Sequence, residues 1–140
     1  MAQLTRQGKV DPLVREFALS LVRGVPENDY GKEIAVMFYY VRDNIRYVRD
    51  IRGIETVQTP EKTLQYKQGD CDDQSVLLAT LLEIVGNATR FKAVGYTPRF
   101  FQHVYVEVYF NGQWIALDPI VKMPLGWSPP GMVSAMVEGV

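Results

Sequence analysis

The dipeptide Asn111-Gly112 constrains the fold most strongly, because it stands between two strand-like runs, residues 103–110 and 113–117. Asn-Gly favours a type I′ turn, whose backbone twist matches that of two paired antiparallel strands. The flanking runs are rich in the β-branched and aromatic residues that are enriched in strands. The sequence therefore predicts a tight antiparallel hairpin over residues 103–117.

The two-residue turn also fixes the register of this hairpin. With Phe110 opposite Gln113, side-chain alternation puts a shared set of residues on one face: His103, Tyr105, Glu107, Trp114, Ala116 and Asp118. His103 and Asp118 are diagonal neighbours on that face, with backbones roughly 7 to 8 Å apart. The only histidine of the chain is therefore expected within side-chain reach of a carboxylate.

The only cysteine, Cys71, lies at the start of an apolar run, in the stretch 69–73. A thiol at a helix N-terminus is close to unsatisfied N–H groups and to the positive end of the helix dipole, which favour the thiolate. Asp70, Asp72 and Asp73 act in the opposite direction, because nearby negative charge raises the pKa of a thiol. Ionisation of Cys71 therefore calls for an imidazolium partner, and His103 is the only candidate.

A thiol, an imidazole and a carboxylate in the order Cys71, His103 and Asp118 lead to a hypothesis of nucleophilic acyl transfer. Glu107 shares the face of His103 and is the second candidate for the carboxylate. Structural roles stay open at this point. A lone cysteine is commonly a small buried apolar residue, and acids in a first helical turn complement the helix dipole.

Apolar residues at helical spacing predict two N-terminal helices, over residues 12–23 and 30–46. Thr59-Pro60 has the form of a cap followed by a short helical turn. Residues 76–85 are apolar on nearly every side, which indicates a central helix that is buried all round.

The remaining stretches complete an α+β fold. Residues 46–57 read as a charged loop with a short strand near Tyr47, and residues 90–96 as a strand that precedes the hairpin. At 140 residues we expect one domain, with a core of about 30–120 and a C-terminal tail, 121–140.

Composition narrows the function classes. A net charge of −1 gives no electrostatic footprint for nucleic acid. The N-terminus lacks the apolar core of a signal peptide, and the longest uncharged run is too short and too rich in proline to cross a membrane. One cysteine and one histidine are too few for structural zinc, and no cofactor-binding motif or calcium-loop spacing is present, which leaves only a magnesium or calcium site made of carboxylates open. We therefore expect a cytoplasmic protein with no cofactor and no metal.

The expected tail, residues 121–140, is the remaining unassigned segment. It carries five large apolar side chains, namely Leu125, Trp127, Met132, Val133 and Met136. Such residues favour docking on a partner, self-association or coverage of a cleft.

Three separate blocks, in order, resemble the transglutaminase-like superfamily, in a small member of bacterial or phage type. They are Gly-Asp-Cys-Asp-Asp at 69–73 with the helix at 76–82, His-Val-Tyr-Val-Glu-Val at 103–108, and Asn-Gly-Gln-Trp-Ile-Ala-Leu-Asp-Pro at 111–119. The resemblance covers roughly Tyr30 to Ile120. It implies an α+β fold of the papain type, with N-terminal helices and a central helix packed on an antiparallel β-sheet.

The resemblance also implies roles for the site residues. Cys71 would be the nucleophile, His103 the general base and acid, and Asp118 the orienting carboxylate. The backbone N–H of Cys71 is a candidate oxyanion donor, and Gln65 lies where papain-like proteases place a glutamine donor.

The implied activity is attack on amide bonds of a protein or peptide substrate through a thioester. A peptidase or amidase is favoured over a transamidase. The alternative is a binding or assembly module that keeps the fold without turnover.

Overall fold

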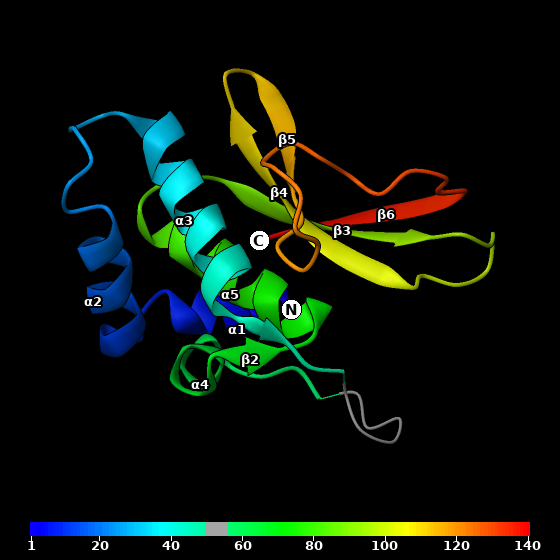
Figure 1. The fold of residues 1–140 in the computed structure, drawn as a ribbon, viewed down its shortest axis with the longest axis horizontal. Helices are drawn as coiled ribbons and strands as arrows, with labels where there is room; N and C mark the ends of the chain where they lie inside the picture. Colours follow the sequence, from blue (N-terminus) through cyan, green and yellow to red (C-terminus); the bar gives the residue numbers. More distant parts are fainter. Residues whose placement is uncertain (50–55) are drawn as a thin grey trace.

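In the computed structural model, helices gather around one central helix, and this helix packs on a four-stranded sheet (Figure 1). The structure describes residues 1–49 and 56–140. The helices are α1 (Ala2–Gly8), α2 (Pro12–Leu21), α3 (Tyr30–Asn44), α4 (Pro60–Tyr66) and α5 (Cys71–Ile84). The sheet consists of β3 (Thr89–Gly95), β4 (His103–Phe110), β5 (Gln113–Leu117) and β6 (Ser134–Gly139). A separate parallel ribbon pairs β1 (Arg46–Tyr47) with β2 (Gln68–Gly69). The predicted α+β class is confirmed.

The predicted helix starts are present, and each is capped. The Asp11 side chain accepts a hydrogen bond from the Leu13 N–H at the start of α2, and Pro12 occupies the first turn, where its missing N–H has no cost. Thr59 caps α4 in the same way by accepting from the Lys62 N–H.

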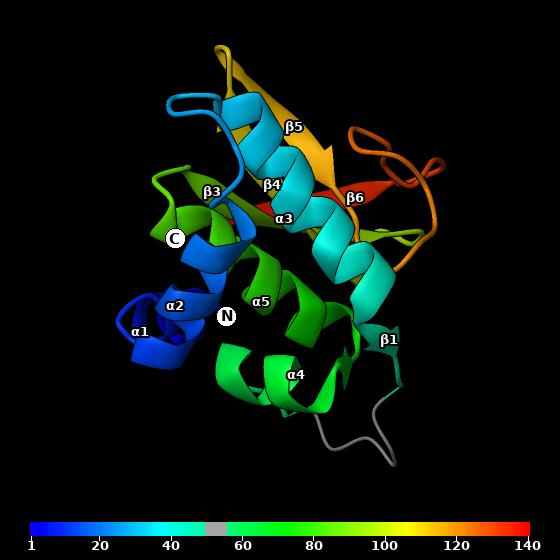
Figure 2. The same ribbon diagram turned by 60° about the vertical axis from the view of Figure 1, so that its left-hand side comes forward.

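Helix α5 is the centre of the fold, as its apolar sequence predicts. Ten consecutive residues, 73–82, are buried. Figure 2 shows α5 between the other helices and the sheet, and its contacts include α1, α2, α3 and α4 together with β3 and β4. A helix so enclosed places its first residue, Cys71, at a fixed point of the domain.

The hairpin of β4 and β5 has the predicted register. Phe110 pairs with Gln113, Tyr109 with Trp114, and Glu107 with Ala116. Asn111 and Gly112 have φ values of 52° and 77°, the positive angles that a type I′ turn requires. The sheet order is β5-β4-β3-β6.

Three elements lie outside the prediction. The polar helix α1 and the two-residue strand β2 have weak local signals, and both are held by contacts with distant parts of the chain. Strand β6 lies within the expected tail and pairs antiparallel with β3. The loop predicted at 46–57 begins with β1, near Tyr47 as expected, and its residues 50–55 lie outside the described residues.

No helix within residues 1–49 and 56–140 is both long and apolar enough to cross a membrane. Over the same residues, no three His, Cys, Asp or Glu side chains come together in a way that could hold a metal ion.

Candidate active site

A capping box fixes the start of α5 and so the position of Cys71. The carboxylate of Asp70, the N-cap residue, accepts a hydrogen bond from the Asp73 N–H at 3.0 Å. Asp73 reciprocates by accepting from the Asp70 N–H at 3.1 Å. Two N–H groups that a helix start leaves unsatisfied are thereby paired.

Further contacts hold this turn against its surroundings. Asp73 also accepts from the backbone N–H of Gln58 at 2.7 Å, and Gln74 donates to the Gly69 carbonyl at 3.0 Å. A β-carbon at Gly69 would lie 2.6 Å from the Asp73 β-carbon, so only glycine fits there. The stretch 69–74 is therefore a rigid mount for the thiol.

The Cys71 thiol is half-buried, and its hydrogen bond goes to Asp72 Oδ1, with the sulfur and oxygen 3.9 Å apart. Burial, followed by the negative charge of Asp72, raises the pKa of Cys71 to about 12. The backbone N–H groups of Val104 and Asp72 act in the opposite direction by stabilising a thiolate, while Asp70 adds to the increase. The resting state is therefore a neutral thiol, and its sulfur lies against the first residues of β4.

His103 is the first residue of β4 and forms a short hydrogen bond with Asp118. Its Nε2 lies 2.6 Å from Asp118 Oδ2. The side chain of Asp118 is 1% exposed and that of His103 14%, so the pair is largely shielded from water. Because Nε2 is held by Asp118, Nδ1 is the ring nitrogen left for proton exchange with a nucleophile. The predicted proximity of the two side chains is confirmed.

Tyr105 lies beside the His103 ring on the same face of the sheet. The two rings are stacked, with centroids 6.0 Å apart and planes at 29°. Burial, together with the charges of Glu107 and Asp118, raises the pKa of Tyr105 to about 12. Its buried hydroxyl has no hydrogen-bond partner among the described residues.

The second candidate carboxylate, Glu107, is engaged elsewhere. Its Oε1 lies 2.7 Å from Arg90 Nε, and its Oε2 lies 3.8 Å from Lys92 Nζ. Glu107 therefore belongs to an ion-pair cluster on the sheet, and Asp118 is the carboxylate that contacts His103.

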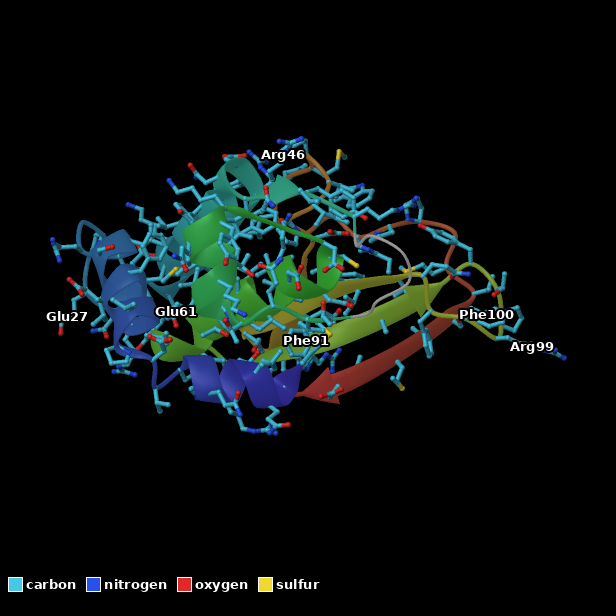
Figure 3. The ribbon with its side chains drawn as sticks, turned by 90° about the horizontal axis from the view of Figure 1, so that it is seen from below. Glu27, Arg46, Glu61, Phe91, Arg99 and Phe100 are labelled. Atoms are coloured by element: carbon cyan, nitrogen blue, oxygen red, sulfur yellow. The ribbon has the colours of Figure 1, made fainter. Side chains whose placement is uncertain are left out.

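Cys71 and His103 line one pocket of about 500 Å³. Its other lining residues come from the N-terminal Met1, the segment after α3, the start of α5, the loop before β4, and strands β3, β4 and β6. Figure 3 shows the labelled Phe91, one of these lining residues, beside α1 and β6. The pocket thus gives a ligand access to the thiol and the imidazole, while Asp118 contacts His103 without lining the pocket.

Gln65 is not among the residues that the pocket brings together. It is exposed on α4 and does not line the pocket. The backbone N–H of Cys71 does lie at the first position of α5, where an N–H has no acceptor within the helix.

Sequence reasoning missed several lining residues, including Arg49 and Glu138. Met136 was expected only as an apolar residue of the tail, with coverage of a cleft as one of its open roles, and Glu138 carried no signal. Tyr105 was placed on the correct face by the hairpin register, but its contact with His103 was not predicted.

Comparisons with known proteins agree on the fold. A chain described as a candidate protease from Parabacteroides distasonis aligns over 88% of this chain, with a TM-score of 0.68 and 17% identity. A candidate cysteine protease from Cytophaga hutchinsonii aligns over 91%, with a TM-score of 0.59 and 20% identity. Legionella pneumophila LapG aligns over 94%, with a TM-score of 0.63 and 14% identity.

The extent of these matches differs. This chain spans 26% of the first protein, 46% of the second and 79% of LapG. No curated protein sequence matches it significantly. The family model of the transglutaminase-like superfamily matches residues 15–119, which include Cys71, His103 and Asp118. The chain belongs to the transglutaminase-like superfamily.

Proposed function

We propose that this protein is a cysteine-dependent amide hydrolase that acts on a protein or peptide through Cys71, His103 and Asp118. The observation that carries the proposal is the 2.6 Å hydrogen bond between His103 and Asp118, beside a pocket that His103 shares with Cys71. An imidazole oriented by a buried carboxylate, with its other nitrogen available, is the partner that a thiol nucleophile needs.

The first half of the reaction forms a thioester. Nδ1 of His103 takes the thiol proton as the Cys71 sulfur attacks the carbonyl carbon of the amide. The tetrahedral intermediate carries an oxyanion, to which the N–H of Cys71 can donate. Its collapse breaks the C–N bond, and the imidazolium gives its proton to the leaving amine.

The second half regenerates the enzyme. His103 takes a proton from water as the water oxygen attacks the thioester carbon. Collapse of this second intermediate breaks the C–S bond, and the proton returns to Cys71. Throughout, Asp118 keeps the ring in one orientation and stabilises its cationic form.

The pKa of about 12 places a requirement on this mechanism, because a resting thiolate is rare at neutral pH. Proton transfer from Cys71 to His103 therefore accompanies substrate binding or the attack itself. An amide bound in the pocket adds its own dipole and excludes water, which changes the electrostatic environment of the sulfur.

We favour water over an amine as the second substrate. The charged side chains of Arg49, Asp72 and Glu138 line the pocket together with Cys71, and such a lining holds water. Transamidation is the competing outcome. It is detected by incorporation of a fluorescent primary amine into an acceptor protein such as casein.

The experiment pairs product analysis with thiol labelling. We expect new amino termini or released ammonia when wild-type protein is incubated with unfolded casein, as measured by mass spectrometry. Cys71→Ala should abolish both products. His103→Ala should reduce the rate by roughly 10²- to 10⁴-fold, the usual contribution of a general acid–base group.

A second candidate function is a non-catalytic binding or assembly module. The hydrogen bond from the thiol to Asp72, together with the raised pKa of Cys71, favours it. Iodoacetamide labelling against pH separates the two functions. A labelling profile that is the same in wild type and His103→Ala supports the module and contradicts the hydrolase.

A further inference from the structure

The floor of the pocket beyond the thiol is formed by a regular patch of β3 and β6. Ala93 pairs with Val104 on one side and with Met136 on the other, so these three side chains form one row across the sheet. Phe91 pairs with Glu138 in a parallel row on the same face, two residues along each strand. All five residues line the pocket that contains Cys71.

The polarity of this floor changes along its length, from apolar to negatively charged. Phe91 is 3% exposed and presents an apolar surface, while Met136 is 54% exposed at the outer strand. Glu138 is exposed at the same strand and is the carboxylate of this floor. The groove therefore offers an apolar surface that ends in a negative charge.

The charge of Glu138 is not neutralised within the part of the chain that the structure describes. No side-chain hydrogen bond or ion pair there includes its carboxylate. Arg49 and Met1, with its amino terminus, are the cationic groups among the described lining residues, and no printed ion pair joins either of them to Glu138. The carboxylate of Glu138 therefore leaves this end of the groove able to accept a cation.

The distance between Val104 and Glu138 matches the reach of one long side chain on a bound extended peptide. Strands lie about 4.8 Å apart and residues rise about 3.3 Å, so Glu138 lies roughly 12 Å from Val104 along the sheet. An extended peptide covers about 3 to 7 Å of this distance in one or two residues. The four-carbon stem of a lysine side chain covers the rest.

We propose that this groove binds a lysine or arginine side chain of the substrate, with its aliphatic stem on Ala93 and Met136 and its cationic head at Glu138. The inference rests on the proposed hydrolase function and names its substrate class: peptides with a basic residue one or two positions from the attacked bond. A long basic side chain suits such a site, because its stem covers apolar surface while its head stays beside solvent.

The test uses two peptidyl acyloxymethyl ketones that differ only in lysine or norleucine at the second residue from the reactive carbonyl. Rates of Cys71 modification are measured by intact-protein mass spectrometry. We expect the lysine probe to react about two- to fivefold faster, as fits one partly exposed ion pair. Because salt screens exposed charges, the preference should fall in about 0.5 M salt.

Two variants with the same change in charge make the test specific. Glu138→Gln should remove the preference for the lysine probe. Glu16→Gln, at an exposed position of α2, should keep it. Equal rates for the two probes in wild type, or a preference that persists in Glu138→Gln, would overturn the inference.

Failure of the proposed hydrolase function would give a different result with the same two probes. If neither probe modifies Cys71 in a manner that depends on His103, the hydrolase proposal fails. The groove is then tested by binding alone, with the amide forms of the two peptides and methyl-labelled methionine in Cys71→Ala protein. A shift of the Met136 methyl resonance with the lysine peptide, larger than with norleucine, upholds the groove; no such difference overturns it.

Discussion

At the scale of single residues, Asp72 acts directly on the protonation state of the Cys71 thiol. It accepts the hydrogen bond of the Cys71 thiol, and its charge is the second cause, after burial, of the raised pKa of Cys71. Removal of this charge stabilises the thiolate of Cys71 relative to the thiol and so lowers its pKa. The residue that follows Cys71 therefore opposes the ionisation of its thiol.

Asp72→Asn should lower the pKa of Cys71 and increase its reactivity. We expect iodoacetamide labelling near pH 8 to become roughly three- to tenfold faster, equivalent to about half to one pKa unit. The measurement is the labelling rate against pH, with Glu16→Gln as the control for loss of a distant negative charge. An unchanged profile in Asp72→Asn would show that the charge of Asp72 does not contribute to the raised pKa of Cys71.

Tyr105 is a second residue of the site for which a single substitution should change the stability of the protein. Its buried hydroxyl lacks a hydrogen-bond partner among the described residues, and an unsatisfied buried polar group costs roughly 1 to 3 kcal/mol. Tyr105→Phe should therefore increase the free energy of unfolding by about 1 kcal/mol, as measured by urea denaturation.

The ring of Tyr105 provides the matched comparison. Tyr105→Ala removes the aromatic ring that stacks on His103 and should cost about 3 to 5 kcal/mol, as core aromatic truncations do. Destabilisation by Tyr105→Phe would mean that the hydroxyl has a partner that matters for folding.

Much of the candidate site could be predicted at this scale. The chain has one cysteine and one histidine, and the Asn111-Gly112 turn set the register that placed Asp118 near His103. The acceptor of the thiol hydrogen bond was not predictable. It depends on side-chain rotamers and on the depth of burial at the start of α5, neither of which follows from residue spacing.

At the scale of elements, the start of α5 decides where the thiol lies. Asp70 and Asp73 form the capping box, and both are buried. Loss of an N-cap acceptor costs about 0.5 to 2 kcal/mol. The cap therefore links the position of Cys71 to the stability of the domain.

Asp70→Ala should lower the free energy of unfolding by about 1 to 2 kcal/mol, and Asp70→Asn should retain most of the stability because asparagine keeps an acceptor oxygen. Urea denaturation of the three proteins measures both effects. Equal losses in the two variants would indicate that the negative charge of Asp70, rather than its hydrogen bond, stabilises α5.

The elements differ in how well local sequence predicts them. The β4–β5 hairpin and α5 were predicted because turn chemistry and apolar pattern act within a few residues. Strand β6 was not predicted, because five of its six residues are exposed and no alternation marks a buried face. Its partner is β3, about 40 residues earlier, so the pairing is a tertiary effect.

At the scale of the whole molecule, β6 makes the C-terminal segment part of the sheet. Residues 134–139 pair along β3 from Arg90 to Gly95, so this portion of the expected tail docks on its own domain. Removal of β6 would leave the backbone groups on one side of β3 without strand partners. It would also remove Met136 and Glu138 from the pocket.

A chain truncated after Val133 should therefore be less stable and more prone to aggregation than the full chain, because β3, which carries Phe91 and Val94, becomes an edge strand. Thermal unfolding by circular dichroism and light scattering measure the two effects. Val133→Ser in the full chain is the control, because Val133 is exposed just before β6. Unaltered stability after truncation would mean that β6 is an accessory strand.

The pairing of β3 with β6 also means that the parts of the candidate site are synthesised at different times. At about 5 to 20 residues per second, β6 emerges several seconds after β3, whereas α5 and β4 are already made. A nascent chain therefore carries the cysteine and the histidine before it has the outer wall of the groove. Under the proposed function, the groove that selects a basic side chain would be completed later in translation than the pair of Cys71 and His103.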